Sequence, residues 1–168
     1  MNWRNIYEII FFENKTFCRY CSFFNYMYDV CRLFQLHLCP RSRGLTEFEH
    51  IEKEYLATIE KLNWPDGVTL PDKLEGEDTG TSFQVGYGDT RASNLWEYSW
   101  MKEWLNSYST DSARAEKALE ELEKAFDMPY MGTDRCDDAT RNYLRENIDK
   151  AKLGDPSGFR ECIELNYE

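Results

Sequence analysis

Hydrophobic residues recur along this chain at the spacing of an α-helix in six places. The clearest is residues 46–63, where apolar side chains three or four positions apart form one stripe. Thr46 and Glu49 stand where a capping box needs a hydroxyl and a carboxylate, so we expect the helix to begin there. The stripe behind this cap comprises Phe48, Ile51, Tyr55, Ile59 and Leu62.

A second helix, residues 93–108, carries large apolar side chains around well over half of its circumference. This pattern is typical of a central helix that others pack around. Trp96, Trp100 and Trp104 follow one another at every fourth position and form an aromatic stripe. Such a stripe can stack sugars or grip a peptide, but large aromatic residues dominate burial in small domains, so we interpret it as core.

Two further helices are predicted at residues 111–126 and 137–153. On the exposed side of the first, Glu120 and Lys124 have the i,i+4 spacing of a favourable ion pair. Gly154 follows the second as a C-terminal cap. A short last helix should start after it, with inward-facing residues at Phe159, Cys162 and Ile163.

The stretch between the helices at residues 46–63 and 93–108 is predicted to be a long loop. Trp64-Pro65-Asp66-Gly67 supplies turn chemistry. Residues 82–87 show a weak alternation of polar and apolar side chains, which allows one short strand. The fold class is therefore mainly α: a compact bundle of four to five helices with a long loop and room for one short strand pair around residues 68–88.

Charge divides the chain into two parts. The 168 residues carry a net charge of −11, yet residues 1–44 hold six basic and three acidic side chains. Residues 45–168 therefore carry 14 basic and 28 acidic side chains, a net of −14. We interpret residues 1–44 as a separate N-terminal segment and residues 45–168 as an acidic helical domain. The acidity disfavours direct binding to nucleic acid or to anionic membranes.

The N-terminal segment has eleven aromatic residues and four of the six cysteines. Its residues 17–38 predict an amphipathic helix. Acidic residues interrupt the apolar run that a secretory signal needs, and charged residues break every window long enough for a transmembrane span. Three interpretations stay open: a packed helical extension, an interfacial amphipathic element, or a stretch translated from a mis-assigned start.

The cysteines are the first candidates for chemistry. Cys18, Cys21, Cys31 and Cys39, with His37 nearby, supply enough soft ligands for one zinc ion. Zinc knuckles need a tight reversal between paired cysteines, whereas these lie in a helix-like run. We therefore favour packing over metal binding and expect no cofactor.

Other candidate sites are weak. Cys136 and Cys162 could join the last two helices as a disulfide in an oxidising compartment. His50 lies among glutamates and is interpreted as a solvated histidine. Gly86 and Gly88 precede a helix as in phosphate-binding loops, but the acidic surroundings favour a simple turn. A further set of acids, which lacks the spacing of a calcium loop, is Asp134, Asp137 and Asp138.

Three motifs follow one another along the chain: the turn at residues 64–67, the sequence Phe83-Gln84-Val85-Gly86-Tyr87-Gly88, and the tryptophan helix that ends in Glu103-Trp104-Leu105. Together they resemble small uncharacterised proteins of high-GC Gram-positive bacteria. The resemblance covers residues 60–108 and the helical tail, and it implies no activity. Some proteins of that kind look exported or membrane-tethered. An extracytoplasmic location therefore stays open beside the slightly favoured cytoplasmic one.

The function favoured by the sequence is that of a non-enzymatic module that binds a protein with a basic surface. Glu75, Glu77 and Asp78 are the expected partner-binding residues, because they gather on the long loop of a domain with excess negative charge. Two alternatives stay open. One is a structural component of an assembly, docked by its N-terminal segment, and the other is a small metal-binding protein that uses the N-terminal cysteines.

Overall fold

A computed structural model describes residues 44–167, and in this part of the chain it confirms a mainly α fold. None of the described helices is long and apolar enough to cross a lipid bilayer. The predicted helix at residues 17–38 lies outside the described residues. The elements are β1 (Leu45–Thr46), α2 (Phe48–Lys61), β2 (Phe83–Gln84), α3 (Tyr87–Ser107), α4 (Ser112–Glu123), the 3-10 turns η3 (Lys124–Asp127) and η4 (Pro129–Met131), α5 (Asp138–Lys152) and α6 (Ser157–Tyr167).

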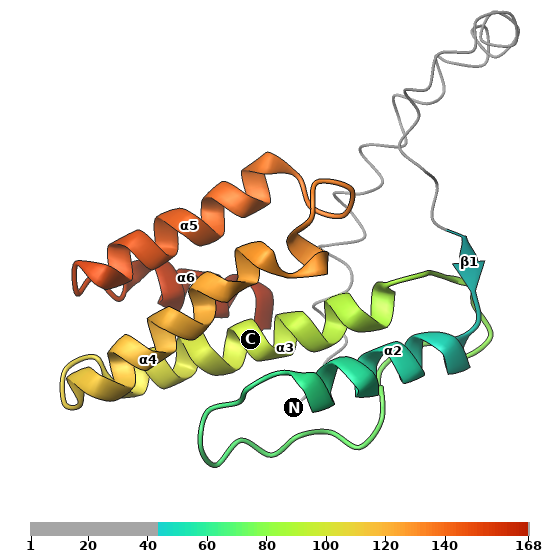
Figure 1. Cartoon of the computed structure of the whole chain (residues 1–168), viewed down its shortest axis with the longest axis horizontal. Coiled ribbons are helices and arrows are strands. Elements are labelled where there is room, and N and C mark those ends of the chain that lie inside the picture. The colour runs from blue at the N-terminus through green and yellow to red at the C-terminus, as the bar shows by residue number, and fades with distance from the viewer. Residues whose placement is uncertain (1–43, 168) are drawn as a thin grey trace, which may run out of the picture. The chain divides into compact units, whose positions relative to one another are not determined.

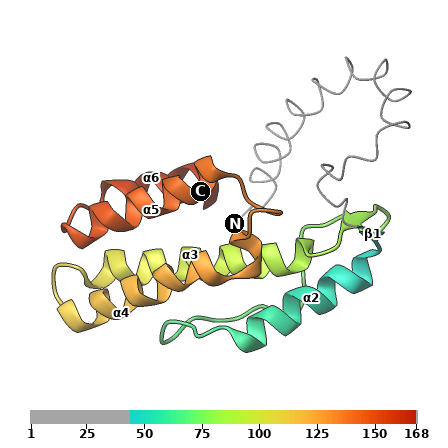
Figure 2. The same cartoon turned by 45° about the horizontal axis from the view of Figure 1, so that its top comes forward.

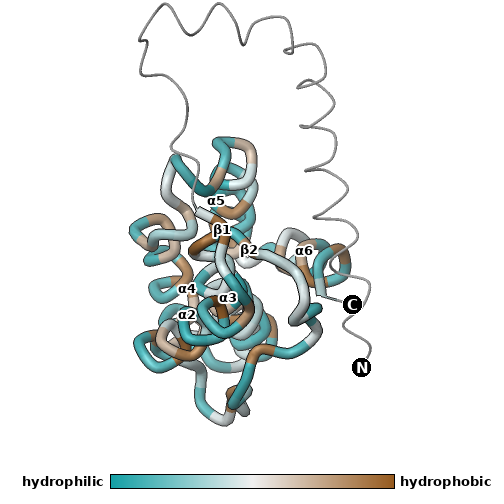
Figure 3. The backbone as a smooth tube through the Cα atoms, turned by 90° about the vertical axis from the view of Figure 1, so that its right-hand side faces the viewer, coloured by the Kyte–Doolittle hydropathy of each residue, from teal (hydrophilic) through white to brown (hydrophobic). Residues whose placement is uncertain are grey.

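Helix α3 is the centre of the domain, as the distribution of its apolar residues predicted. Helix α2 packs on one side of it, α4 runs beside it, and α5 and α6 form a layer on the side away from α2 (Figures 1 and 2). Trp96, Trp100 and Trp104 are each no more than 2% exposed, which confirms that the aromatic stripe is core. Coloured by hydropathy, the helices change between hydrophilic and hydrophobic along their length, as expected where each has a buried face (Figure 3).

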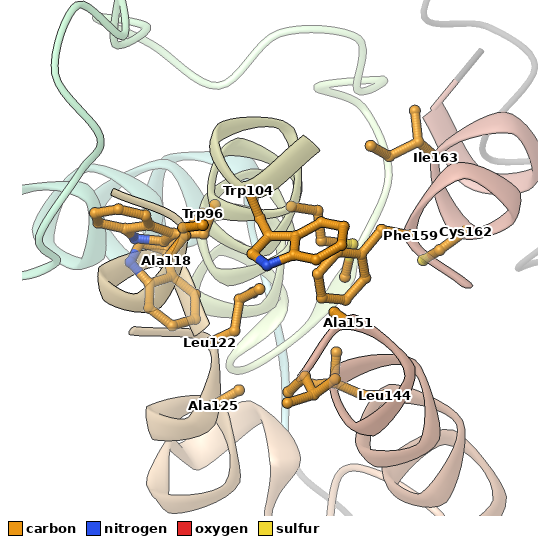
Figure 4. Close-up of a cluster of buried hydrophobic side chains, with 14 of the residues drawn as sticks. Trp96, Trp104, Ala118, Leu122, Ala125, Leu144, Ala151, Phe159, Cys162 and Ile163 are labelled. Carbon is orange, nitrogen blue, oxygen red and sulfur yellow. The ribbon is translucent and has the colours of Figure 1, made fainter. Parts of the chain in front are cut away.

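The buried residues form two clusters. The larger one lies between α3, α4, α5 and α6, where Trp104 meets Phe159 edge to face with ring centroids 5.3 Å apart (Figure 4). Leu144 and Ala151 of α5 approach the same cluster. The smaller cluster joins α2, the long loop and α3, and it comprises Ile51, Tyr55, Ile59, Leu74 and Ala92. Helix α3 contributes to both clusters and so connects the two halves of the core.

The start of α2 differs from the prediction. Thr46 belongs to β1, and the cap position is taken by Glu47, whose side chain makes no capping hydrogen bond. The predicted capping box of Thr46 and Glu49 is therefore wrong. The physical reason is that the backbone at Thr46 is extended and paired with Phe83, which keeps Thr46 in the strand and outside the cap.

The short strand pair was expected within residues 68–88, but only one of its two strands lies there. Strand β2 pairs antiparallel with β1, in the register Leu45 to Gln84 and Thr46 to Phe83. Helices α2 and α3 begin at the same end of the domain (Figure 1), which brings together the residues that precede them. The long loop exists because the chain must return along α2, a helix of 14 residues and about 21 Å.

The later helices begin where the sequence placed them. Asp111 and Asp137 cap α4 and α5, each carboxylate accepting a hydrogen bond from the backbone N–H three residues on. Helix α4 ends at Glu123 and continues as the 3-10 turn η3. Lys124 forms its ion pair with Glu121, at 2.6 Å, instead of the expected Glu120, and the side chain of Glu121 is only 10% exposed.

Helices α2 and α3 approach so closely that only glycine fits at residue 88. A Cβ atom at Gly88 would lie 1.8 Å from the backbone oxygen of Ile51. The helix that the sequence placed at residues 93–108 in fact begins at Tyr87, so this glycine lies inside its first turn.

Gly88→Ala should therefore lower the free energy of unfolding by about 3 kcal/mol or more, because the backbone of α2 must move to admit the methyl group. Urea denaturation followed by circular dichroism measures the change. Gly44→Ala is the matched control, since a Cβ atom there meets nothing within 4 Å. Equal stability of the two variants would show that α2 and α3 are not in close contact at this point.

Candidate binding surface

Exposed carboxylates cover α2 and the loop that returns along it. Residues 47–78 include ten acidic and three basic side chains. The loop is fixed to the helix because Leu74 is 4% exposed within the smaller core cluster and its N–H donates to the Glu52 carboxylate at 3.3 Å. We name as the acidic surface the exposed members of this set: Glu47, Glu49, Glu60, Asp66, Asp72, Glu75 and Asp78.

The three predicted partner-binding residues have different surroundings. Glu75 is exposed and forms an ion pair with Lys73 at 3.0 Å. Asp78 is also exposed and accepts a hydrogen bond from the backbone N–H of Gly80 at 2.9 Å. Both carboxylates are therefore open to a partner.

Glu77 instead holds the loop against α3. Its side chain is 10% exposed, pairs with Arg91 at 3.1 Å and accepts a hydrogen bond from the Tyr87 hydroxyl at 2.8 Å. Burial raises the pKa of Glu77, and the bond from Tyr87 acts in the opposite direction. Burial likewise lowers the pKa of Arg91 to about 10. This carboxylate serves the fold, and little of it is available to another protein.

Glu77→Gln should destabilise the domain by about 1–3 kcal/mol, because it removes the charge opposite a largely buried guanidinium. Glutamine keeps an oxygen for the Tyr87 hydroxyl, so the variant isolates the effect of charge. Glu75→Gln, at an exposed ion pair, should leave the urea midpoint almost unchanged. If the two variants unfold at the same urea concentration, the anchoring role of Glu77 is wrong.

The N-terminus of α3 is occupied by a carboxylate of the same chain. Gly86, with a φ of 91°, precedes the helix, and its N–H donates to both oxygens of Glu54 at 2.8 and 2.9 Å. The N–H of Gly88 donates to Glu54 at 3.3 Å. A negative charge here satisfies the unpaired N–H groups and complements the helix dipole. The position that a phosphate would take is filled, in keeping with the interpretation of these glycines as a turn.

Arg135, from the turn before α5, makes further bonds to the start of α3. Its guanidinium pairs with Asp89, donates to the carbonyl of Gly86 and lies 2.7 Å from the Thr90 hydroxyl. The Thr58 hydroxyl donates to the same aspartate at 2.9 Å. One half-buried network therefore ties α2, the start of α3 and the turn before α5 into a rigid unit.

An open groove lies beside this network. It has a volume of about 620 Å³ and runs between the end of β2 and the segment from η3 to the turn before α5. Its apolar walls come from Val85, Phe126, Met128 and Pro129, and its charged residues are Asp127, Asp134 and Arg135, while Gly86 and Gly132 expose backbone. No local pattern in the sequence marks this groove, because its two sides lie about 40 residues apart.

Glu97 is a buried carboxyl in the core of the domain. It is 8% exposed in the middle of α3, and the Tyr130 hydroxyl of η4 donates a hydrogen bond to it. Burial raises the pKa of Glu97 to about 7, and the bond from Tyr130 offsets part of that effect. Buried carboxyls with such pKa values are frequent at active sites, but Glu97 lines neither this groove nor the hollow of about 380 Å³ over β1.

Glu97→Gln should remove a pH-dependent loss of stability. Because the pKa of Glu97 rises from 4.5 to about 7 on folding, the native protein holds a proton that the unfolded chain releases. Stability is therefore lost as pH rises from about 4.5 to 7, by on the order of 3 kcal/mol, and the neutral amide avoids this loss.

Urea titrations of wild type and variant across this pH range test the effect. As pH rises, the free energy of unfolding of Glu97→Gln should increase relative to that of the wild type. Glu120→Gln, at an exposed residue of α4, should show no such increase. Parallel profiles for wild type and Glu97→Gln would mean that Glu97 has an ordinary pKa in the fold.

The predicted metal ligands lie outside the described residues: Cys18, Cys21, Cys31, Cys39 and His37. Within residues 44–167, no three side chains of His, Cys, Asp or Glu come together in a way that could hold a metal ion. The acids at the start of α5 have other partners, since Asp137 caps the helix and Asp138 pairs with Arg141.

The remaining candidates have separate neighbours. Cys136 and Cys162 are both free thiols, so this structure does not contain the disulfide that the sequence allowed. The Sγ atom of Cys136 lies 3.5 Å from the sulfur of Met131, and Cys162 is buried on α6. His50 is 53% exposed and lies 3.2 Å from the carboxylate of Glu54, in agreement with a solvated histidine.

Comparisons of the chain with models of protein families, with curated proteins and with solved structures find no match. The resemblance to proteins of Gram-positive bacteria stays a prediction.

Proposed function

We propose that residues 45–168 form a non-enzymatic domain that binds a protein with a basic surface through the acidic surface on α2 and the long loop. The observation that supports this most is the concentration of charge. Residues 47–78 have ten acids against three bases, which is half of the domain's net charge of −14 in a quarter of its length. A partner of opposite sign relieves the repulsion among these groups.

The anchoring of the loop supports the same proposal. Leu74, Glu52 and Glu77 fix the loop to α2 and α3, so the exposed carboxylates of Glu75 and Asp78 are held in place before any partner arrives. A preformed surface loses little conformational entropy on binding. Charge on such a surface steers association and makes it sensitive to salt.

The two alternatives from the sequence depend on other residues. A structural component docked by its N-terminal segment, and a metal protein that uses Cys18, Cys21, Cys31 and Cys39, both require residues 1–43. The acidic surface gives neither of them particular support. It favours the interaction domain.

The test uses the triple variant Asp72→Asn, Glu75→Gln and Asp78→Asn in the full chain. Each neutralised carboxylate should remove about 0.5 kcal/mol of attraction. Affinity for the partner should therefore fall by about tenfold. The partner is captured from an extract of the source cells at about 50 mM salt, identified and purified, and its dissociation constant is then measured at low salt and at about 500 mM salt.

A second triple variant controls for the loss of charge itself. Glu146→Gln, Asp149→Asn and Glu161→Gln remove three exposed carboxylates from α5 and α6, on the side of α3 away from α2 (Figure 2). This control should retain the affinity of the wild type. A partner that binds all three proteins equally, or that is retained equally at both salt concentrations, contradicts the proposal.

A further inference from the structure

We infer that the groove between Val85 and Pro129 is a second contact point for the same basic partner, where it takes a peptide segment with a large apolar side chain flanked by lysine or arginine. This inference rests on the proposed function and adds a site to it. The groove is open and has a volume of about 620 Å³, which is ample for one large side chain and the backbone that carries it.

The walls of the groove determine the apolar part of the ligand. Val85 is 38% exposed and faces the groove from the end of β2, while Phe126, Met128 and Pro129 line it from η3 and η4. Phe126 is covered on one ring face by Arg145, whose guanidinium carbon lies 4.6 Å from the ring centroid. An apolar anchor that enters here removes these side chains from water, and this burial of apolar surface stabilises the complex.

The charges around the groove determine the sign of the flanking residues. Arg135 is the basic residue of the lining, and its ion pair with Asp89 neutralises it. The exposed carboxylate of Asp127, in a domain with a net charge of −14, then gives the groove a negative potential. Lysine or arginine beside the apolar anchor matches this potential, whereas an acidic peptide would be repelled.

The network beneath the groove keeps its shape fixed. Gly86 is held by Glu54 through its N–H and by Arg135 through its carbonyl. Arg135 in turn comes from the segment that forms the opposite wall, so the two sides of the groove are tied together. A groove fixed in this way is preorganised for a short peptide.

Selection of a random peptide library on the full-length protein tests the inference. We expect enriched peptides that contain a large apolar residue next to lysine or arginine. One enriched peptide, made synthetically, is then titrated against two groove variants, Val85→Lys and Asp127→Lys. Each places a positive charge at an exposed position of the lining and should weaken binding by about tenfold or more.

Glu120→Lys is the matched control, because it makes the same charge reversal at an exposed residue of α4 outside the groove lining. Its affinity should stay within about twofold of the wild type. Enrichment of acidic or purely apolar peptides, or no enrichment, overturns the inference. So does a self-association of the protein, seen by light scattering, that Val85→Lys abolishes, because the occupant is then a second copy.

The two proposals can fail separately. If the purified partner responds to the triple variant at Asp72, Glu75 and Asp78 but not to Val85→Lys or Asp127→Lys, the acidic surface stands and the groove is not a contact. If peptides bind in the groove while the partner is indifferent to the triple variant, the groove stands without the proposed function.

Discussion

The domain depends on the burial of α3, a helix that is surrounded on most sides and so has to satisfy its polar groups with partners from the same chain. The indole N–H groups of Trp96 and Trp100 both donate to the carbonyl of Asn63, at 2.7 and 3.1 Å, and this fixes the end of α2 against the aromatic stripe. Glu54 satisfies the first N–H groups of the helix. Each of these bonds joins α3 to residues more than 30 positions away, so burial of the helix organises the neighbouring segments as well.

Local patterns were sufficient to predict most of the helices, because the alternation of apolar and polar residues directly reflects which face is buried. They failed where a distant partner decided the outcome. Thr46 has the sequence context of a helix cap, yet its pairing with Phe83 places it in a strand. Gly88 weakens a helix by its propensity, so the predicted start at residue 93 was too late. The close approach of Ile51 requires a glycine at that position, and α3 begins before it at Tyr87.

The candidate surface was predictable only in outline. The acidity of the long loop is visible in the sequence, but Glu75 and Glu77 look alike there, and only their surroundings separate an exposed carboxylate from one bonded to Arg91 and Tyr87. The groove and Glu97 were missed for the same reason. Their character comes from residues of other segments: the ion pair of Arg135 with Asp89, and the hydroxyl of Tyr130 that reaches a carboxyl in the core.

Carboxylates therefore have two physical roles in this domain. Those of Glu54 and Glu77 are partly buried, have partners in a neighbouring segment and hold the fold together. Those that are exposed on α2 and the loop repel one another and lower the stability that the first group supplies. A domain that only needed to stay soluble would spread such charge over its whole surface, whereas here half of the net charge lies in residues 47–78. Because Leu74, Glu52 and Glu77 fix the loop to α2 and α3, movement of the loop cannot relieve this repulsion. It is relieved by salt or by a partner of opposite charge, which is the physical argument for binding at this surface.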